Sequence, residues 1–245
     1  MRVAALVRDC SRFGALAAEG LELLEIGAQP TVQVLPKAAA LFYSIPPLGP
    51  PADIVMHSWL CALEPRRIVY ISSTGVYGEA AEVDEHTLPA PKDARGIARL
   101  TAEQRILEGP WSTLILRAAA IYGPHRGVHT AIREGRLPRS AGSGVISRIH
   151  AEDLAALSAA GLFSDVEGAW PVADDAPCTS AEIAAWYQAR FGGPAPDGIT
   201  EFSVAGRRVN GRKIRALLGV ELEYPTWQAG LVASLREEEA REAIA

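Results

Sequence analysis

Three hydroxyl side chains stand at the end of an apolar run near the middle of the chain. Residues 68–71 read Ile-Val-Tyr-Ile and predict a strand buried on both faces, as in a parallel sheet covered by helices. Ser72, Ser73 and Thr74 follow directly. Ligands of such sheets lie just beyond the carboxyl ends of the strands, so these hydroxyls are candidates to hydrogen-bond a ligand. A polar exit from the strand explains the same residues about equally well.

Three motifs carry a resemblance to a known family. Residues 72–78, Ser-Ser-Thr-Gly-Val-Tyr-Gly, resemble the active-site strand of the extended short-chain dehydrogenase/reductases, which include the NAD(P)-dependent sugar-nucleotide epimerases and dehydratases. Residues 117–124 resemble the family's strand ending in Tyr-Gly-Pro, and residues 148–155 its Arg-Ile-His-x-x-Asp-Leu-Ala segment. The motifs occur in the family's order, and the similarity extends over about residues 2–235.

The resemblance implies an α/β fold: a Rossmann-like, doubly wound parallel sheet with a small C-terminal substrate lobe. We expect a core at residues 1–165, the lobe and the last core elements at 166–235, and a frayed helical tail at 236–245. The implied ligand of the lobe is a small molecule similar to a nucleotide sugar.

The resemblance also implies roles for single residues. Ser73 matches the hydroxyl that polarises a substrate carbonyl or alcohol; Thr74 is a second hydroxyl, and Tyr122 a poor substitute acid or base. Arg148 and His150 are expected to face the substrate cleft. For His150, a structural hydrogen bond that orients the following helix is an equally good interpretation.

The family's catalytic Tyr-x-x-x-Lys is absent from this sequence. On the predicted helix at 95–108, Arg95 falls at the tyrosine position and Arg99 at the lysine position. The three lysines, residues 37, 92 and 213, never follow a tyrosine by four residues. An arginine stays protonated and cannot act as the base. Arg95 and Arg99 are therefore candidates to bind an anionic substrate, although a solvated helix face is the more common role.

The start of the chain departs from the family pattern. Residues 2–7, 13–19 and 21–26 predict strand, helix and strand, which match the family from its second strand onward. The family's first strand and its Gly-x-x-Gly-x-x-Gly loop have no counterpart, so the fold is expected to be N-terminally truncated. Three explanations are open: a truncated sequence, a sheet that closes up around the gap, or edges covered by a second subunit. We favour closing up together with homo-oligomerisation.

The residues that remain for a cofactor point to NADP. Arg8 and Arg12 follow the family's second strand, where an arginine accommodates a 2′-phosphate. Ser44 and Pro46 lie after the strand predicted at 38–44, in a loop that borders the cofactor in the family or simply forms a rigid connector. Without the glycine-rich loop the diphosphate loses several charge-assisted hydrogen bonds of about 1.5–3 kcal/mol each, so NADP binding is expected to be weak.

Composition excludes several other classes of protein. The 245 residues suffice for one sizeable α/β domain. A net charge of -5 argues against a nucleic-acid partner, and no apolar run approaches the length of a membrane span. Cys10, Cys61 and Cys178 have no metal-ligand spacing and are interpreted as free thiols in the cytoplasm, so no metal site is predicted.

Together these features predict a Rossmann-type protein with impaired or absent redox catalysis that acts as a binding or accessory protein. This combination is similar to the atypical members of the superfamily. An active NADP-dependent oxidoreductase or epimerase, whose cofactor loop is missing from this sequence, is the first alternative. A structural subunit with no small ligand is the second.

Overall fold

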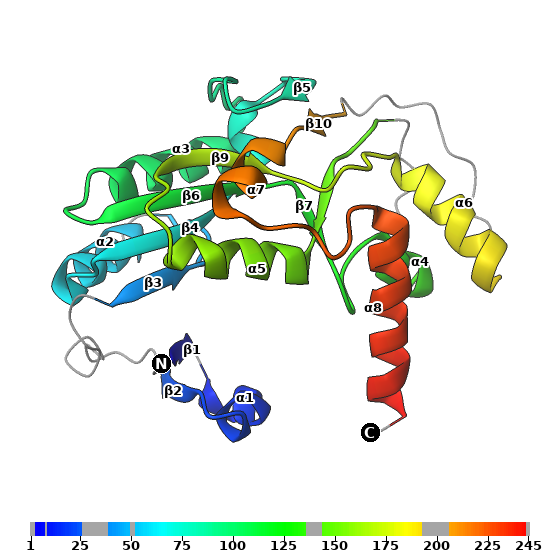
Figure 1. The fold of residues 1–245 in the computed structure, drawn as a ribbon, viewed down its shortest axis with the longest axis horizontal. Helices are drawn as coiled ribbons and strands as arrows, with labels where there is room; N and C mark the ends of the chain where they lie inside the picture. The colour runs from blue at the N-terminus through cyan, green and yellow to red at the C-terminus, as the bar shows by residue number, and fades with distance from the viewer. Residues whose placement is uncertain are drawn as a thin grey trace.

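A parallel sheet of four strands forms the centre of the molecule (Figure 1). The structure is a computed structural model and describes residues 3–7, 9–25, 39–49, 52–135, 144–192 and 206–243. The strand order is β3 (Ala40–Tyr43), β4 (Arg67–Ser73), β6 (Ser112–Ala118) and β9 (Gly168–Val172), and every neighbouring pair is parallel. The predicted strands at 38–44 and 68–71 are thus confirmed.

Helices cover both faces of this sheet because alternate residues of each strand point to opposite sides. Ile68 and Tyr70 pack against α2 (Ala52–Leu63) and α3 (Ala94–Leu107). Val69 and Ile71 lie in a second core with α5 (Ala151–Leu162) and α7 (Arg212–Leu218). The expected Rossmann-like, doubly covered parallel sheet is therefore present.

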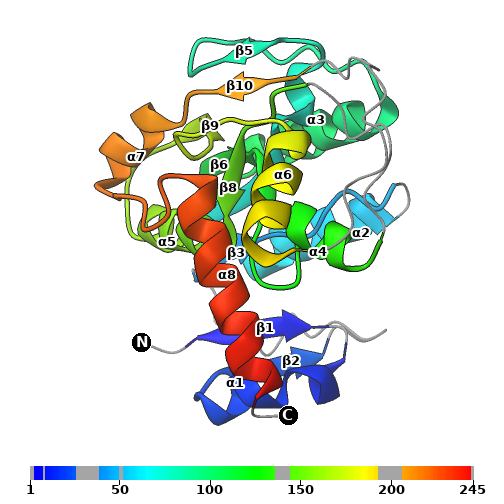
Figure 2. The ribbon, with the colours of Figure 1, turned by 90° about the vertical axis from the view of Figure 1, so that its right-hand side faces the viewer.

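The N-terminal segment forms a small unit of its own on the β3 side of the central sheet (Figures 1 and 2). Its elements are β1 (Ala4–Val7), η1 (Cys10–Phe13), α1 (Gly14–Ala18) and β2 (Glu22–Glu25), as strand, helix and strand were predicted. β1 and β2 pair in parallel, and within the described residues neither pairs with β3. The expectation that the sheet closes up is wrong. No side chain of β1 is buried, so β1 lacks the two buried faces of an interior parallel strand.

The remaining elements surround the carboxyl ends of the central strands. The strand that resembles the family's Tyr-Gly-Pro strand is interrupted after Ala118, and its second part, β7 (Ala120–Tyr122), pairs with β8 (Arg148–His150). A short pair joins β5 (Glu82–Val83) to β10 (Arg208–Val209). Three further helices are α4 (Val128–Arg133), α6 (Ser180–Phe191) and α8 (Trp227–Glu242), and we refer to these three together as the lobe.

The ends of two of these helices test local predictions. Thr179 and Glu182 have the spacing of a capping box in the sequence, and the structure forms one at the start of α6. Thr179 Oγ1 accepts from the Glu182 N–H at 3.0 Å, and the Glu182 carboxylate accepts from the Thr179 N–H at 2.7 Å. By contrast, residues 236–242 are not a frayed tail. They continue α8, and Glu238 is only 1% exposed. Within the described residues, no helix is long and apolar enough to cross a membrane.

A buried ion pair connects the central sheet to α3. Arg117 of β6 donates from Nη2 to Glu103 Oε2 at 2.7 Å and from Nε to both carboxylate oxygens at 3.2 Å. Its Nη1 donates to the Tyr77 hydroxyl at 3.2 Å, in the 3-10 helix η3 (Thr74–Tyr77) that follows β4. The three side chains are buried. One arginine therefore fixes the relative positions of α3, β6 and the segment after Ser73.

We expect Glu103→Gln to lower the free energy of unfolding by about 3–5 kcal/mol, because it leaves the buried guanidinium of Arg117 without its counter-charge. Urea unfolding followed by circular dichroism measures this. The matched control is Glu79→Gln, which breaks an exposed ion pair with Lys92 at 3.7 Å and should change stability by less than about 1 kcal/mol. Equal effects of the two variants would contradict a structural role for the buried pair.

Candidate functional site

The carboxyl end of β4 carries the three hydroxyls that the sequence singled out. Ser73 caps η3, and its Oγ accepts a hydrogen bond of 3.1 Å from the N–H of Gly75. Since the oxygen only accepts in this contact, the Ser73 O–H can still donate to a ligand. Ser72 is buried, and its hydroxyl has no partner among the described residues. Ser73 and Thr74 are half-buried, so these two remain accessible at the end of the strand.

Arg207 holds the segment after Ser73 in place, a role that the sequence did not reveal. Its Nε donates to the carbonyl of Ala80 at 3.0 Å, and its two terminal nitrogens donate to the carbonyls of Thr74 and Gly78. In the sequence, Arg207 begins a basic run that suggests a solvated flank or a phosphate contact. The bonds to Thr74, Gly78 and Ala80 span more than a hundred residues, so no local pattern could have indicated them.

The two arginines that were predicted to fall at the family's Tyr and Lys positions have different environments. Arg99 is half-buried; its Nη1 donates to the Ile71 carbonyl at 3.2 Å and lies 3.3 Å from the Tyr70 hydroxyl. Arg95 is exposed near the start of α3. The structure thus brings Arg99, and not Arg95, against the strand that ends at Ser73.

Tyr122 is buried beneath α8. It is 3% exposed, and its hydroxyl has no hydrogen-bond partner among the described residues. Gly230 of α8 packs directly against the ring: a Cβ at this glycine would lie 2.2 Å from the Tyr122 oxygen. Burial, reinforced by the carboxylates of Asp174 and Asp153, raises the pKa of Tyr122 far above its ordinary value. This hydroxyl therefore stays protonated at neutral pH.

Arg148 and His150 are brought together with Tyr122 by the pairing of β7 and β8. His150 Nδ1 accepts from the Glu152 N–H at 3.3 Å and caps α5, while Nε2 lies 3.1 Å from the hydroxyl of Ser234 in α8. The structural interpretation of His150 is therefore confirmed for one ring nitrogen. Arg148 is 4% exposed and lines a cavity beside Tyr122.

The residues predicted to bind the cofactor lie in two separate parts of the structure, the N-terminal unit and the loop after β3. Ser44 and Pro46 follow β3 and are exposed, and Arg12 is exposed in η1 of the N-terminal unit. Arg8 lies outside the described residues. Their role in binding a dinucleotide remains a prediction.

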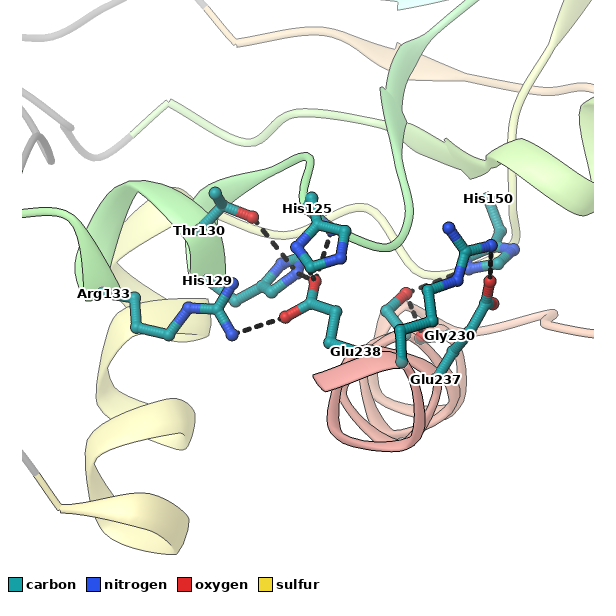
Figure 3. A network of polar contacts seen from close by, with 10 residues as sticks. His125, His129, Thr130, Arg133, His150, Gly230, Glu237 and Glu238 are labelled. Carbon is teal, nitrogen blue, oxygen red and sulfur yellow. Dashed lines mark hydrogen bonds and ion pairs between the residues drawn. The ribbon is translucent and has the colours of Figure 1, made fainter. Parts of the chain in front are cut away.

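A buried carboxylate fastens α8 to α4 (Figure 3). Glu238 Oε1 lies 3.1 Å from His129 Nε2 and accepts the backbone N–H of His125, and Oε2 forms an ion pair of 2.6 Å with Arg133 Nη1. His129 is fully buried and Glu238 is 1% exposed. In the sequence Glu238 belongs to a run of charges that is typical of a solvated helix. Its burial is decided by the position of α8 alone.

The electrostatics of this cluster follow from its burial. Burial alone would raise the pKa of Glu238, but the His125 N–H, the His129 ring and the charge of Arg133 together lower it. Burial lowers the pKa of His129, and the neighbouring Glu238 offsets this only in part. At neutral pH the cluster therefore contains a carboxylate, a guanidinium and a neutral imidazole.

Comparison with known proteins finds similarity at the level of structure. No family model and no curated protein matches the sequence. A functionally unknown conserved protein from Silicibacter pomeroyi is 30% identical, with a TM-score of 0.79 over 97% of this chain and 91% of the other. A protein from Methylobacillus flagellatus, assigned as an NAD-dependent epimerase/dehydratase, is 25% identical, with a TM-score of 0.68 over 97% and 98%.

A third solved structure shares the fold at lower identity. MoeE5, solved in complex with UDP-glucose and NAD, is 18% identical, with a TM-score of 0.78 over 100% of both chains. These matches run over nearly the whole of the compared chains, so they do not show the N-terminal truncation that the sequence predicted.

We expect acid to destabilise the protein through His129. The unfolded chain binds a proton near the ordinary histidine pKa of about 6.5, whereas the buried ring binds it only at lower pH, so stability falls as pH falls through this range. His129→Gln keeps a donor for Glu238 and removes the titration. The loss of unfolding free energy between about pH 7.5 and about pH 5.5 should be smaller in this variant than in the wild type.

Urea unfolding at the two pH values makes the measurement, with the exposed His86→Gln as control. The buried Asp174, whose pKa burial raises to about 7, acts in the opposite direction but is common to all three proteins. A His129→Gln variant as acid-sensitive as the wild type would contradict the prediction.

Proposed function

We propose, from the premise that this chain belongs to the epimerase/dehydratase family of Rossmann proteins, that it binds a small molecule without transferring a hydride to or from it. In this proposal the protein acts as a binding or accessory protein. The ligand lies between the carboxyl ends of the central strands and the lobe formed by α4, α6 and α8.

One feature of the sequence carries the proposal: the chain has no Tyr-x-x-x-Lys, and Arg99 is predicted to fall at the family's lysine position. Arg99 donates to the Ile71 carbonyl, two residues before Ser73, and a guanidinium has no acceptor with which to take up a proton. A lysine there lowers the pKa of a neighbouring tyrosine so that it can act as a base. Here the tyrosine position is Arg95, and the buried hydroxyls of Tyr77 and Tyr122 have raised pKa values, so neither supplies a base near neutral pH.

Ser73 and Thr74 remain in the proposal as groups that hold a ligand. Their hydroxyls can donate to a carbonyl or an alcohol, and Arg207 and the hydrogen bond to Gly75 keep the segment in one conformation. Arg95 and Arg99 are proposed as a positive field at the same end of the sheet. Binding needs such groups, whereas hydride transfer also needs a base.

We expect no turnover of a nicotinamide. The purified chain, mixed with NADP⁺ or NAD⁺ and UDP-glucose, should produce reduced cofactor no faster than the buffer does, as followed by absorbance. Arg95→Tyr combined with Arg99→Lys restores the family's pair and serves as a probe of whether the base alone is missing. Turnover by the unaltered chain would overturn the proposal and support a working oxidoreductase.

The proposal assigns weak binding of NADP to Arg8, which precedes Asp9 after β1. We expect Arg8→Ala to weaken NADPH binding about tenfold or more, since it removes a charge-assisted contact with the 2′-phosphate. NADH binding should not change. Fluorescence titration measures both, with the exposed Arg66→Ala, at the opposite end of β4, as control. NADPH binding that is tight and insensitive to Arg8→Ala would refute the assignment.

A further inference from the structure

Three helices of the lobe enclose a cavity of about 340 Å³ beside Tyr122. Its walls are mostly apolar: α4 contributes Val128, α6 contributes Ile183, and α8 contributes Trp227 and Leu231. The volume lies within the usual range for small-molecule sites, which are concave and apolar with a few polar groups. We call this space the α4–α6–α8 cavity.

The cavity is preformed because two of its walls are tied together. Glu238 of α8 binds His129 and Arg133 of α4, and His150 bonds to Ser234 of α8 (Figure 3). A ligand that enters does not have to order these helices, so little of its binding energy is lost to conformational entropy.

Arg148 is the single charged side chain among the described residues that line the cavity. Its guanidinium donates to the carbonyls of Ile146 and Cys178 at 2.9 and 2.8 Å, to Cys178 Sγ at 3.2 Å and to Ser180 Oγ at 3.3 Å. None of these acceptors is a carboxylate. No ion pair within 4.0 Å joins Arg148 to an acidic side chain of the described residues.

The acidic groups around Arg148 compensate its charge only in part: Glu182 and Asp174 interact with the guanidinium, but burial still lowers the pKa of Arg148. Burial raises the pKa of the Cys178 thiol to about 11, so the sulfur is neutral at pH 7. Burial also raises the pKa of Asp174, the nearest acid after β9, to about 7. A buried cation without a carboxylate in direct contact is costly, and an anion in the cavity would lower that cost.

We propose that the α4–α6–α8 cavity binds an apolar carboxylate, whose carboxylate contacts Arg148 and Ser180 and whose hydrocarbon body packs against Trp227, Leu231 and Ile183. This proposal rests on the proposed function because both assume that the lobe binds a small molecule. The ligand class proposed here is an apolar carboxylate and not a nucleotide sugar. Two phosphate charges need more than one cation to replace their water, and this lining offers one guanidinium and apolar walls.

The test is isothermal titration of the full chain with octanoate, octanol and UDP. We expect octanoate to bind at least tenfold more tightly than octanol, because only the carboxylate forms charge-assisted hydrogen bonds. UDP should not compete with octanoate. Octanol binding as tightly as octanoate, or UDP binding and displacing it, would overturn the proposal.

Variants locate the site. Ala131→Phe fills the cavity from α4 and should weaken octanoate binding at least tenfold, whereas Ala155→Phe, on the exposed face of α5, should leave it unchanged. Arg148→Met should abolish the preference for octanoate over octanol. Should Arg148→Met not fold, the Ala131→Phe result decides: unchanged binding in that variant refutes the site. Hydride transfer is measured in a separate absorbance assay. Observed hydride transfer would contradict the proposed function but would not contradict octanoate binding in the α4–α6–α8 cavity.

Discussion

The buried contact between Arg117 and Glu103 is the interaction on which the arrangement of the site depends. It joins the middle of the sheet to α3, and through Tyr77 it reaches the helical turn that follows Ser73. A charge buried among apolar side chains has few acceptable geometries, because any displacement leaves it unsolvated. The pair therefore fixes Arg99, carried by α3, relative to Ser73, carried by β4. Arg207 adds a second restraint on the same turn from the far end of the sequence.

A second buried charge, on Glu238, holds two helices of the lobe together. The buried charges of Glu238 and Arg148 differ in whether an oppositely charged side chain contacts them. Glu238 is neutralised by neighbours on α4, so it stabilises the contact between two helices. Arg148 is bonded only to neutral groups. A structural arginine such as Arg117 has its carboxylate; an arginine without one retains capacity for a ligand. This contrast within one chain is why Arg148, and not Arg117, is assigned to a binding role.

Loss of the Tyr-Lys pair and retention of the scaffold are physically compatible. The strands pack through residues such as Val69, Ile115 and Leu116, which lie away from the carboxyl edge and do not depend on what stands there. In our proposal, an arginine in place of a base at this edge changes the available chemistry but leaves the core intact. A cleft without a base can still select a ligand by shape and charge.

What the sequence determined by itself is local: the apolar strands, the capping box at Thr179 and Glu182, the hydroxyls after β4 and the absence of a Tyr-x-x-x-Lys pair. Hydrophobic period and capping chemistry act over a few residues, so they can be read in order along the chain. The separate β1–β2 pair, the burial of Tyr122 under Gly230 and the roles of Arg207 and Glu238 were decided by the tertiary structure. Each depends on which distant part of the chain a residue contacts in the fold. The sequence alone does not distinguish a charged residue that is exposed from one that is buried.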